Sequence, residues 1–94
     1  MVFEWDENKR LSNLKKHGID FQDVEQFFDS NPICFQDDRK DYGEERFVAF
    51  GIIEGRVIIT AYTYREQTIR IISMRKANAR ERRLHEQYLQ NKLE

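Results

Sequence analysis

The stretch RFVAFGIIEGRVIITAYTYREQTIRIISMRK, residues 46–76, decides the fold. It contains three long runs that are rich in β-branched and aromatic residues, over 46–54, 56–64 and 68–75. A Glu-Gly dipeptide, residues 54–55, joins the first two runs, and an Arg-Glu-Gln segment, residues 65–67, lies between the last two. Short polar breaks between apolar runs are typical of tight hairpin turns. The stretch therefore predicts an antiparallel meander of three strands.

Helical patterns lie on both sides of this meander. Asp6 is a plausible N-cap and Gly18 a plausible C-terminal stop for a first helix. Apolar residues at helical spacing predict a second helix, and the C-terminal segment predicts a third. We expect strands over 2–5 and 33–37, and helices over 7–17, 20–29 and 77–92. This order predicts a single α+β domain over residues 1–94, with an antiparallel central sheet, two N-terminal helices and one C-terminal helix.

Composition limits the class of protein. The chain has 94 residues, of which 39% are hydrophobic and 13% aromatic, as expected for a small folded domain. It has no apolar run of the roughly 20 residues that cross a membrane, and its N-terminus does not look like a signal peptide. Cys34 is the lone cysteine, which fits a reducing compartment, so we expect a cytoplasmic protein. The spacing of cysteine and histidine predicts no metal site and no cofactor.

Charge is distributed very unevenly along a chain whose net charge is only −1. Residues 65–83 hold seven positive and two negative side chains, a local charge of +5. Residues 20–45 hold nine negative and two positive side chains, a local charge of −7. Such separated charge either forms two surfaces for different partners or forms solvated faces without a partner.

The expected positions of Arg75 and Arg80 make these two arginines candidate site residues. Strict alternation along the last strand places Arg75 on the same side as Ile69 and Ile71. Helical spacing places Arg80 on or beside an inward stripe of the last helix. An inward arginine needs an anionic partner, so Arg80 either forms an internal salt bridge or faces a phosphate in a groove between sheet and helix. The residues of that stripe are Ala77, Leu84, Tyr88 and Leu89.

Arginines beside aromatic residues are typical of single-stranded RNA binding. Tyr62 and Tyr64 share one face of a strand, where they either stack on bases or simply pack in the sheet. RNA can be cut without a metal ion when its own 2′-OH attacks the adjacent phosphate, which requires a base, cations and a proton donor. Candidate bases are Glu81, His17 and Glu44; candidate cations are Arg65, Arg75, Arg80 and Lys16; Tyr62, Tyr64 and Tyr88 could position or donate.

Three ordered blocks give the chain a family resemblance. They are FEWDENKRLSNLKKHGIDF at 3–21, DDRKDYGEERFVAFG at 37–51 and YTYREQTIRIISMRKANARERRLHEQY at 62–88. Together they resemble the BrnT toxins. The resemblance implies a fold like that of the RelE-type ribonuclease toxins and RNA cleavage that halts translation. It also implies a ribbon-helix-helix antitoxin of the BrnA type, a heterotetramer of two toxins and two antitoxins, and operator DNA bound through the antitoxin.

The resemblance also suggests roles for individual residues. It makes Arg65 and Arg80 the leading catalytic candidates, while Lys16, His17, Glu81 and Tyr88 match motif residues. The other expected RNA-binding residues are Arg75, Lys76, Arg83, Tyr62 and Tyr64. We therefore expect a metal-independent endoribonuclease that acts by transesterification through the 2′-OH. Two alternatives remain: an inactive toxin-like module that pairs with an antitoxin and modulates operator binding, and a scaffold with unrelated partners.

Overall fold

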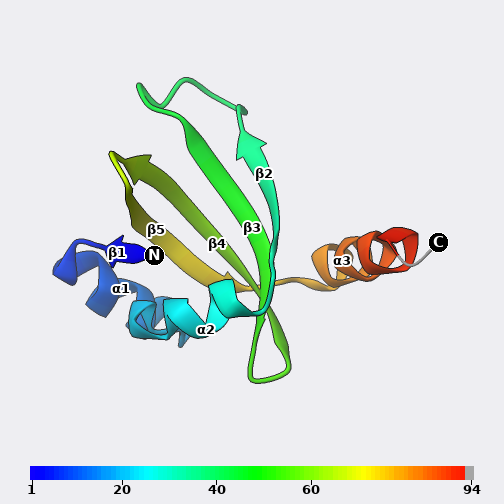
Figure 1. Cartoon of the computed structure of the whole chain (residues 1–94). Helices are drawn as coiled ribbons and strands as arrows, with labels where there is room; N and C mark the ends of the chain where they lie inside the picture. The colour runs from blue at the N-terminus through cyan, green and yellow to red at the C-terminus, as the bar shows by residue number, and fades with distance from the viewer. Residues whose placement is uncertain (93–94) are drawn as a thin grey trace.

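A five-stranded mixed sheet forms the centre of the computed structural model, which describes residues 1–92 (Figure 1). Its strand order is β1-β5-β4-β3-β2, and all neighbours are antiparallel except β1 and β5, which are parallel. The prediction of an antiparallel sheet is therefore wrong for this one pair. The elements are β1 (Val2–Glu4), α1 (Glu7–His17), the 3₁₀ turn η1 (Phe21–Asp23), α2 (Val24–Asp29), β2 (Ile33–Asp37), β3 (Arg46–Ile53), β4 (Arg56–Arg65), β5 (Thr68–Lys76) and α3 (Ala79–Lys92).

The three-strand meander is confirmed, and its turns have the expected chemistry. Ile53 pairs with Arg56, so only Glu54 and Gly55 connect β3 to β4. Both have positive φ, 50° and 76°, which is the geometry of a type I′ hairpin turn. Glycine tolerates this conformation without strain, and the turn matches the natural twist of the two strands.

A β-bulge in β5 changes which side chains share a face. The pairing between β4 and β5 shifts by one residue between Ala61 and Tyr62 of β4, and Ile72 has no partner there. A single extra residue reverses the alternation of every residue beyond it. Arg75 consequently lies on the opposite face from Ile71, so its predicted side of the sheet is wrong.

The hydrophobic core lies between one face of the sheet and the segment η1–α2. The rings of Phe21 and Phe27 and the side chain of Val24 are buried completely or nearly so. They pack against apolar residues of β3, β4 and β5. Close approach requires Gly51 in β3, because a Cβ atom there would lie 2.8 Å from Cε1 of Phe27. These contacts leave the opposite face of the sheet, here called the open face, available for other functions.

Helix α1 is attached to the sheet by a buried polar residue. Nδ2 of Asn13 donates to the carbonyl of Ile19 at 3.0 Å and to that of Met74 at 2.7 Å. The backbone N–H of Met74 donates to Oδ1 of Asn13 at 3.2 Å. β1 pairs only with residues 68–70 of β5. Beyond the end of β1, Asn13 thus makes the hydrogen bonds that a neighbouring strand would make with the outer edge of β5.

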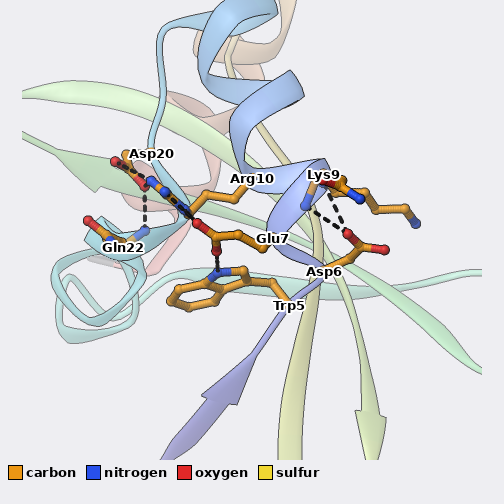
Figure 2. Close-up of polar contacts among 8 residues, drawn as sticks. Trp5, Asp6, Glu7, Lys9, Arg10, Asp20 and Gln22 are labelled. Atoms are coloured by element: carbon orange, nitrogen blue, oxygen red, sulfur yellow. Dashed lines mark hydrogen bonds and ion pairs between the residues drawn. The ribbon is translucent and has the colours of Figure 1, made fainter.

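A network around Arg10 fixes the direction of α1. Its guanidinium, on a side chain only 14% exposed, pairs with Glu7 and with Asp20, which precedes η1 (Figure 2). Nε1 of Trp5 donates to the Glu7 carboxylate at 3.2 Å. The hydrogen bond from Arg10 is the main reason that the pKa of Glu7 lies below its usual value, with Trp5 contributing. We call Glu7, Arg10 and Asp20 the Arg10 network.

The predicted inward stripe is confirmed only at Ala77, which is buried, and is wrong for its three members on the last helix. Leu84, Tyr88 and Leu89 of α3 are 43 to 44% exposed, whereas His85 is buried. α3 begins at Ala79 and projects from the end of the sheet (Figure 1). Within residues 1–92, no helix combines the length and apolar character needed to cross a membrane.

Candidate functional site

A cavity of about 350 Å³ opens on the face of the sheet that α1 and α2 leave free. Strands β2 to β5 supply its floor, and the first turn of α3 supplies one wall. Within the described part of the chain, no group of three His, Cys, Asp or Glu side chains could hold a metal ion. The cavity is lined by Phe35, Gln36, Asp37, Asp38, Arg39, Val48, Phe50, Ile59, Ala61, Ser73, Arg75 and Glu81.

One wall of the cavity carries a bidentate ion pair between β5 and α3. Nη1 and Nη2 of Arg75 each lie 2.8 Å from an oxygen of Glu81. Glu81 also accepts from the backbone of Asn78, and Asn78 caps the N–H of Glu81 in return, which is a capping box. The hydrogen bond from Arg75 lowers the pKa of Glu81, although burial opposes it. Hydrogen bonding to Glu81 also raises the pKa of Arg75, while burial and the charge of Arg39 oppose that rise.

The facing wall carries a second arginine–carboxylate pair at the end of β2. Nε of Arg39 lies 2.8 Å from Oδ1 of Asp37, and Nη2 lies 2.9 Å from Oδ2. The hydroxyl of Tyr42 donates to the same carboxylate at 3.1 Å. These hydrogen bonds, that of Arg39 above all, hold the pKa of Asp37 well below its usual range. The Arg39 side chain is 79% exposed, so its guanidinium can turn toward a ligand.

The structure brings together only part of the set of residues predicted from sequence. Arg75 and Glu81 share the cavity, but Asp37 and Arg39, which sequence analysis missed, face them from β2. No local sequence pattern predicts that residues of β2 face residues of β5, because β3 and β4 lie between these two strands in the sheet. Ser73 was also missed, since the bulge that places it in the cavity has no clear sequence signature.

Lys16 and His17 lie in a second depression beside the cavity. This groove has a volume of about 240 Å³ and runs between α1 and the bulged part of β5. Ser73 lines both the groove and the cavity. Lys16 and His17 therefore lie next to the cavity, although they do not line it. The groove is lined by Lys9, Ser12, Asn13, Lys16, His17, Ile72 and Ser73.

Arg65 and the tyrosines lie at the far end of β4. Arg65 pairs with Thr68, seven residues along β5 from Arg75, which corresponds to about 23 Å of strand. Nη2 of Arg65 lies 3.8 Å from Oε1 of Glu44. Tyr64 is 53% exposed, but Tyr62 is 2% exposed, and burial is the main cause that raises its pKa. Of the two alternatives for these tyrosines, packing in the sheet is confirmed for Tyr62, whose ring lies among those of Phe28, Phe47 and Tyr64, so a platform that includes Tyr62 is excluded.

The remaining candidates are exposed on α3 and the segment that leads to it. Arg80 and Arg83 both point into solvent, as does Lys76 at the end of β5. Arg80 was expected to face inward, but the internal salt bridge expected for it is formed by Arg75 instead. The ring of Tyr88 packs edge-on against Phe35, with centroids 5.3 Å apart.

The Arg75–Glu81 pair makes stability depend on pH. A carboxylate whose folded pKa is lowered stabilises the fold above its unfolded pKa, near 4.5, and this contribution is lost as the pH falls through the folded pKa. We expect Glu81→Gln, which keeps a capping-box side chain, to lower the free energy of unfolding at pH 7 by on the order of 1 kcal/mol or less, because Arg75 is 40% exposed. Urea unfolding at pH 7 and pH 3 checks this. The difference from wild type should shrink at pH 3, and a difference that grows there would contradict it.

Comparison with known proteins identifies the family. The model of the family described as "Ribonuclease toxin, BrnT, of type II toxin-antitoxin system" matches residues 5–81. A search among curated proteins found no significant match. The matched region covers most of the chain, from Trp5 before α1 to Glu81 in the cavity wall. The chain belongs to this family of ribonuclease toxins.

Proposed function

We propose that this BrnT-family toxin cleaves RNA in the open-face cavity, by transesterification through the 2′-OH and without a metal ion. The observation that carries the proposal is the pair of arginines, Arg39 and Arg75, on facing walls of one cavity that also holds the Glu81 carboxylate. Planar guanidinium groups bind phosphate oxygens in a bidentate manner, and they stabilise the added charge of a phosphorane-like transition state. The family assignment supports the reaction class.

The ion pair between Arg75 and Glu81 suggests how binding prepares the base. A phosphate that engages the Arg75 guanidinium competes with the Glu81 carboxylate for the same hydrogen bonds. Loss of those bonds raises the pKa of Glu81 toward its ordinary value, which makes it a better base. Glu81 then accepts the 2′ proton as the 2′-oxygen bonds to phosphorus. The bond to the 5′-oxygen breaks, that oxygen takes a proton from water, and the hydroxide so formed takes the proton from Glu81, which restores the base.

A second candidate function is an inactive binding module, and one observation favours it. Of the described residues, three carboxylates, Asp37, Asp38 and Glu81, and two arginines line the cavity. Both arginines are already paired with carboxylates, so an approaching phosphate has to displace them. A chain that only paired with an antitoxin would tolerate such a neutralised site.

Cleavage of a defined oligoribonucleotide by the purified chain separates these two functions. We expect products that end in a 2′,3′-cyclic phosphate, unchanged yield in excess chelator, and no cut at a position whose 2′-OH is replaced by hydrogen. A cut at the 2′-deoxy position, or a requirement for divalent metal, would contradict the mechanism. Intact RNA after incubation with folded protein would favour the binding module.

Membership in a type II family implies an antitoxin partner. We propose that this antitoxin is a BrnA-like ribbon-helix-helix protein, that two copies of it join two toxins, and that the complex binds operator DNA through the antitoxin. The acidic segment 20–45, with its local charge of −7, supports contact with a basic antitoxin segment. The family assignment also supports two further proposals, a RelE-like fold and action in the cytoplasm.

A further inference from the structure

The groove along the outer edge of β5 has the chemistry of an anion site. Lys9 and Lys16 of α1 line it together with His17, and the bulged residues of β5 form its other side. Among residues 1–92, no carboxylate lines it. Its charged side chains are therefore all potential cations, whereas those of the open-face cavity are a near-balanced mixture of both signs.

Asn13 determines where the two lysines lie. Lys9 is four residues before Asn13 and Lys16 is three residues after it, so all three lie on one side of α1. Because Asn13 is bonded to the edge of β5, the lysines are held above that same edge. Figure 2 shows the Lys9 side chain extending away from the Arg10 network, on the other side of the helix.

Neither lysine is neutralised by a side chain in the part of the chain that the structure describes. Within residues 1–92, Lys9 and Lys16 take part in no ion pair, and both are exposed. In the cavity, by contrast, Arg39 and Arg75 are each paired with a carboxylate. A phosphate can enter the groove without displacing a carboxylate, so simple electrostatics favours the groove as the stronger phosphate contact.

The groove and the cavity meet at the β-bulge. Ser73 lines both depressions. Arg75, which points to the same face two residues further along β5, lies about 7 Å from it. A flexible chain that leaves the cavity across Ser73 therefore enters the groove directly.

We infer that this groove is a subsite for the phosphate of a nucleotide adjacent to the cleaved bond. The ligand is single-stranded RNA, because its backbone has to turn from the face of the sheet around the edge of β5, which a stiff duplex does not do. The inference rests on the proposed cleavage in the cavity, because that reaction defines the cleaved bond and therefore the nucleotide adjacent to it. It assigns phosphate binding to Lys9 and Lys16.

Binding of an uncleavable RNA tests the subsite. The probe is a fluorescent six-nucleotide RNA with 2′-O-methyl groups throughout, titrated with wild type, with the double variant Lys9→Gln/Lys16→Gln, and with Lys15→Gln. Lys15 is exposed on α1 but does not line the groove, so it is the matched control. For single strands the logarithm of affinity falls with a slope of about −0.7 per neutralised phosphate against the logarithm of salt concentration. Because the subsite neutralises one phosphate, we expect the double variant to bind roughly 5-fold more weakly at about 0.1 M salt, with a slope smaller by about 0.7.

The outcomes separate this inference from the proposed function. Wild-type affinity and slope in the double variant would overturn the subsite, as would equal weakening by Lys15→Gln or no binding by the wild type. Binding that depends on the two lysines, in a protein that leaves unmodified RNA intact, would retain the groove as an RNA site and reject the cleavage. Thermal unfolding of each variant confirms that the fold is intact, which the exposure of all three lysines favours.

Discussion

Arg75→Ala is expected to lower the rate of RNA cleavage by about 10²- to 10³-fold, the usual cost of removing one group that stabilises transition-state charge. The guanidinium of Arg75 lies in the cavity and holds the Glu81 carboxylate with two hydrogen bonds of 2.8 Å. Its removal takes away a phosphate ligand and leaves the base without its positioning partner. Single-turnover cleavage of a labelled oligoribonucleotide measures the effect.

Two control variants make this prediction specific. Arg56→Ala removes an exposed arginine of the β3–β4 hairpin and should leave the cleavage rate within about twofold of wild type, since surface changes of this kind alter stability by only about 0.5 kcal/mol. Arg65→Ala tests the competing expectation from sequence, and the strand distance from Arg75 predicts little change. A large loss in Arg65→Ala with full activity in Arg75→Ala would move the active site to the other end of β4.

Asn13→Ala is expected to destabilise the fold strongly. It removes three hydrogen bonds and leaves the N–H and C=O of Met74 and the C=O of Ile19 without partners. An orphaned buried polar group costs about 1 to 3 kcal/mol, so we expect a loss of roughly 3 to 5 kcal/mol. For a domain of this size that lowers Tm by roughly 12 to 40 °C. Calorimetry or thermal circular dichroism measures this shift.

Ser12→Ala is the matched control for that variant. Ser12 precedes Asn13 on α1 and is exposed, and its substitution should move Tm by no more than a few degrees. Hydrogen exchange adds a local test, because the amide of Met74 should lose its protection in Asn13→Ala. A Tm for Asn13→Ala equal to that of Ser12→Ala would show that α1 is held by other contacts.

Features governed by local chemistry could be predicted from the sequence. The Glu54-Gly55 turn has a characteristic residue pair, and the structure places both residues at positive φ. Asp6 accepts hydrogen bonds from the first turn of α1, and Gly18 ends that helix in the left-handed conformation. Each depends on interactions within a few residues, which a single sequence displays.

Features set by distant contacts could not be predicted. β1 is a three-residue strand, and nothing in its sequence specifies that it pairs in parallel with β5. The bulge at Ile72 leaves a pattern that still looks like regular alternation, yet it moves Ser73 and Arg75 to the open face. Asn13 looks like an ordinary polar helix residue until its partner at Met74 is known. The candidate site was therefore foreseen only where its members lie close in sequence, as Arg75 and Glu81 do.

Chemical-shift mapping by NMR is the measurement on which the location of the RNA site depends. A 94-residue protein is small enough for full backbone assignment, and a 2′-O-methyl oligoribonucleotide binds without being cut. The cavity and its adjoining groove predict the largest shift changes at Ser73, Arg75 and Glu81, together with the end of β2 near Arg39. Shift changes centred on Arg65 instead, with these four residues unaffected, would contradict the site.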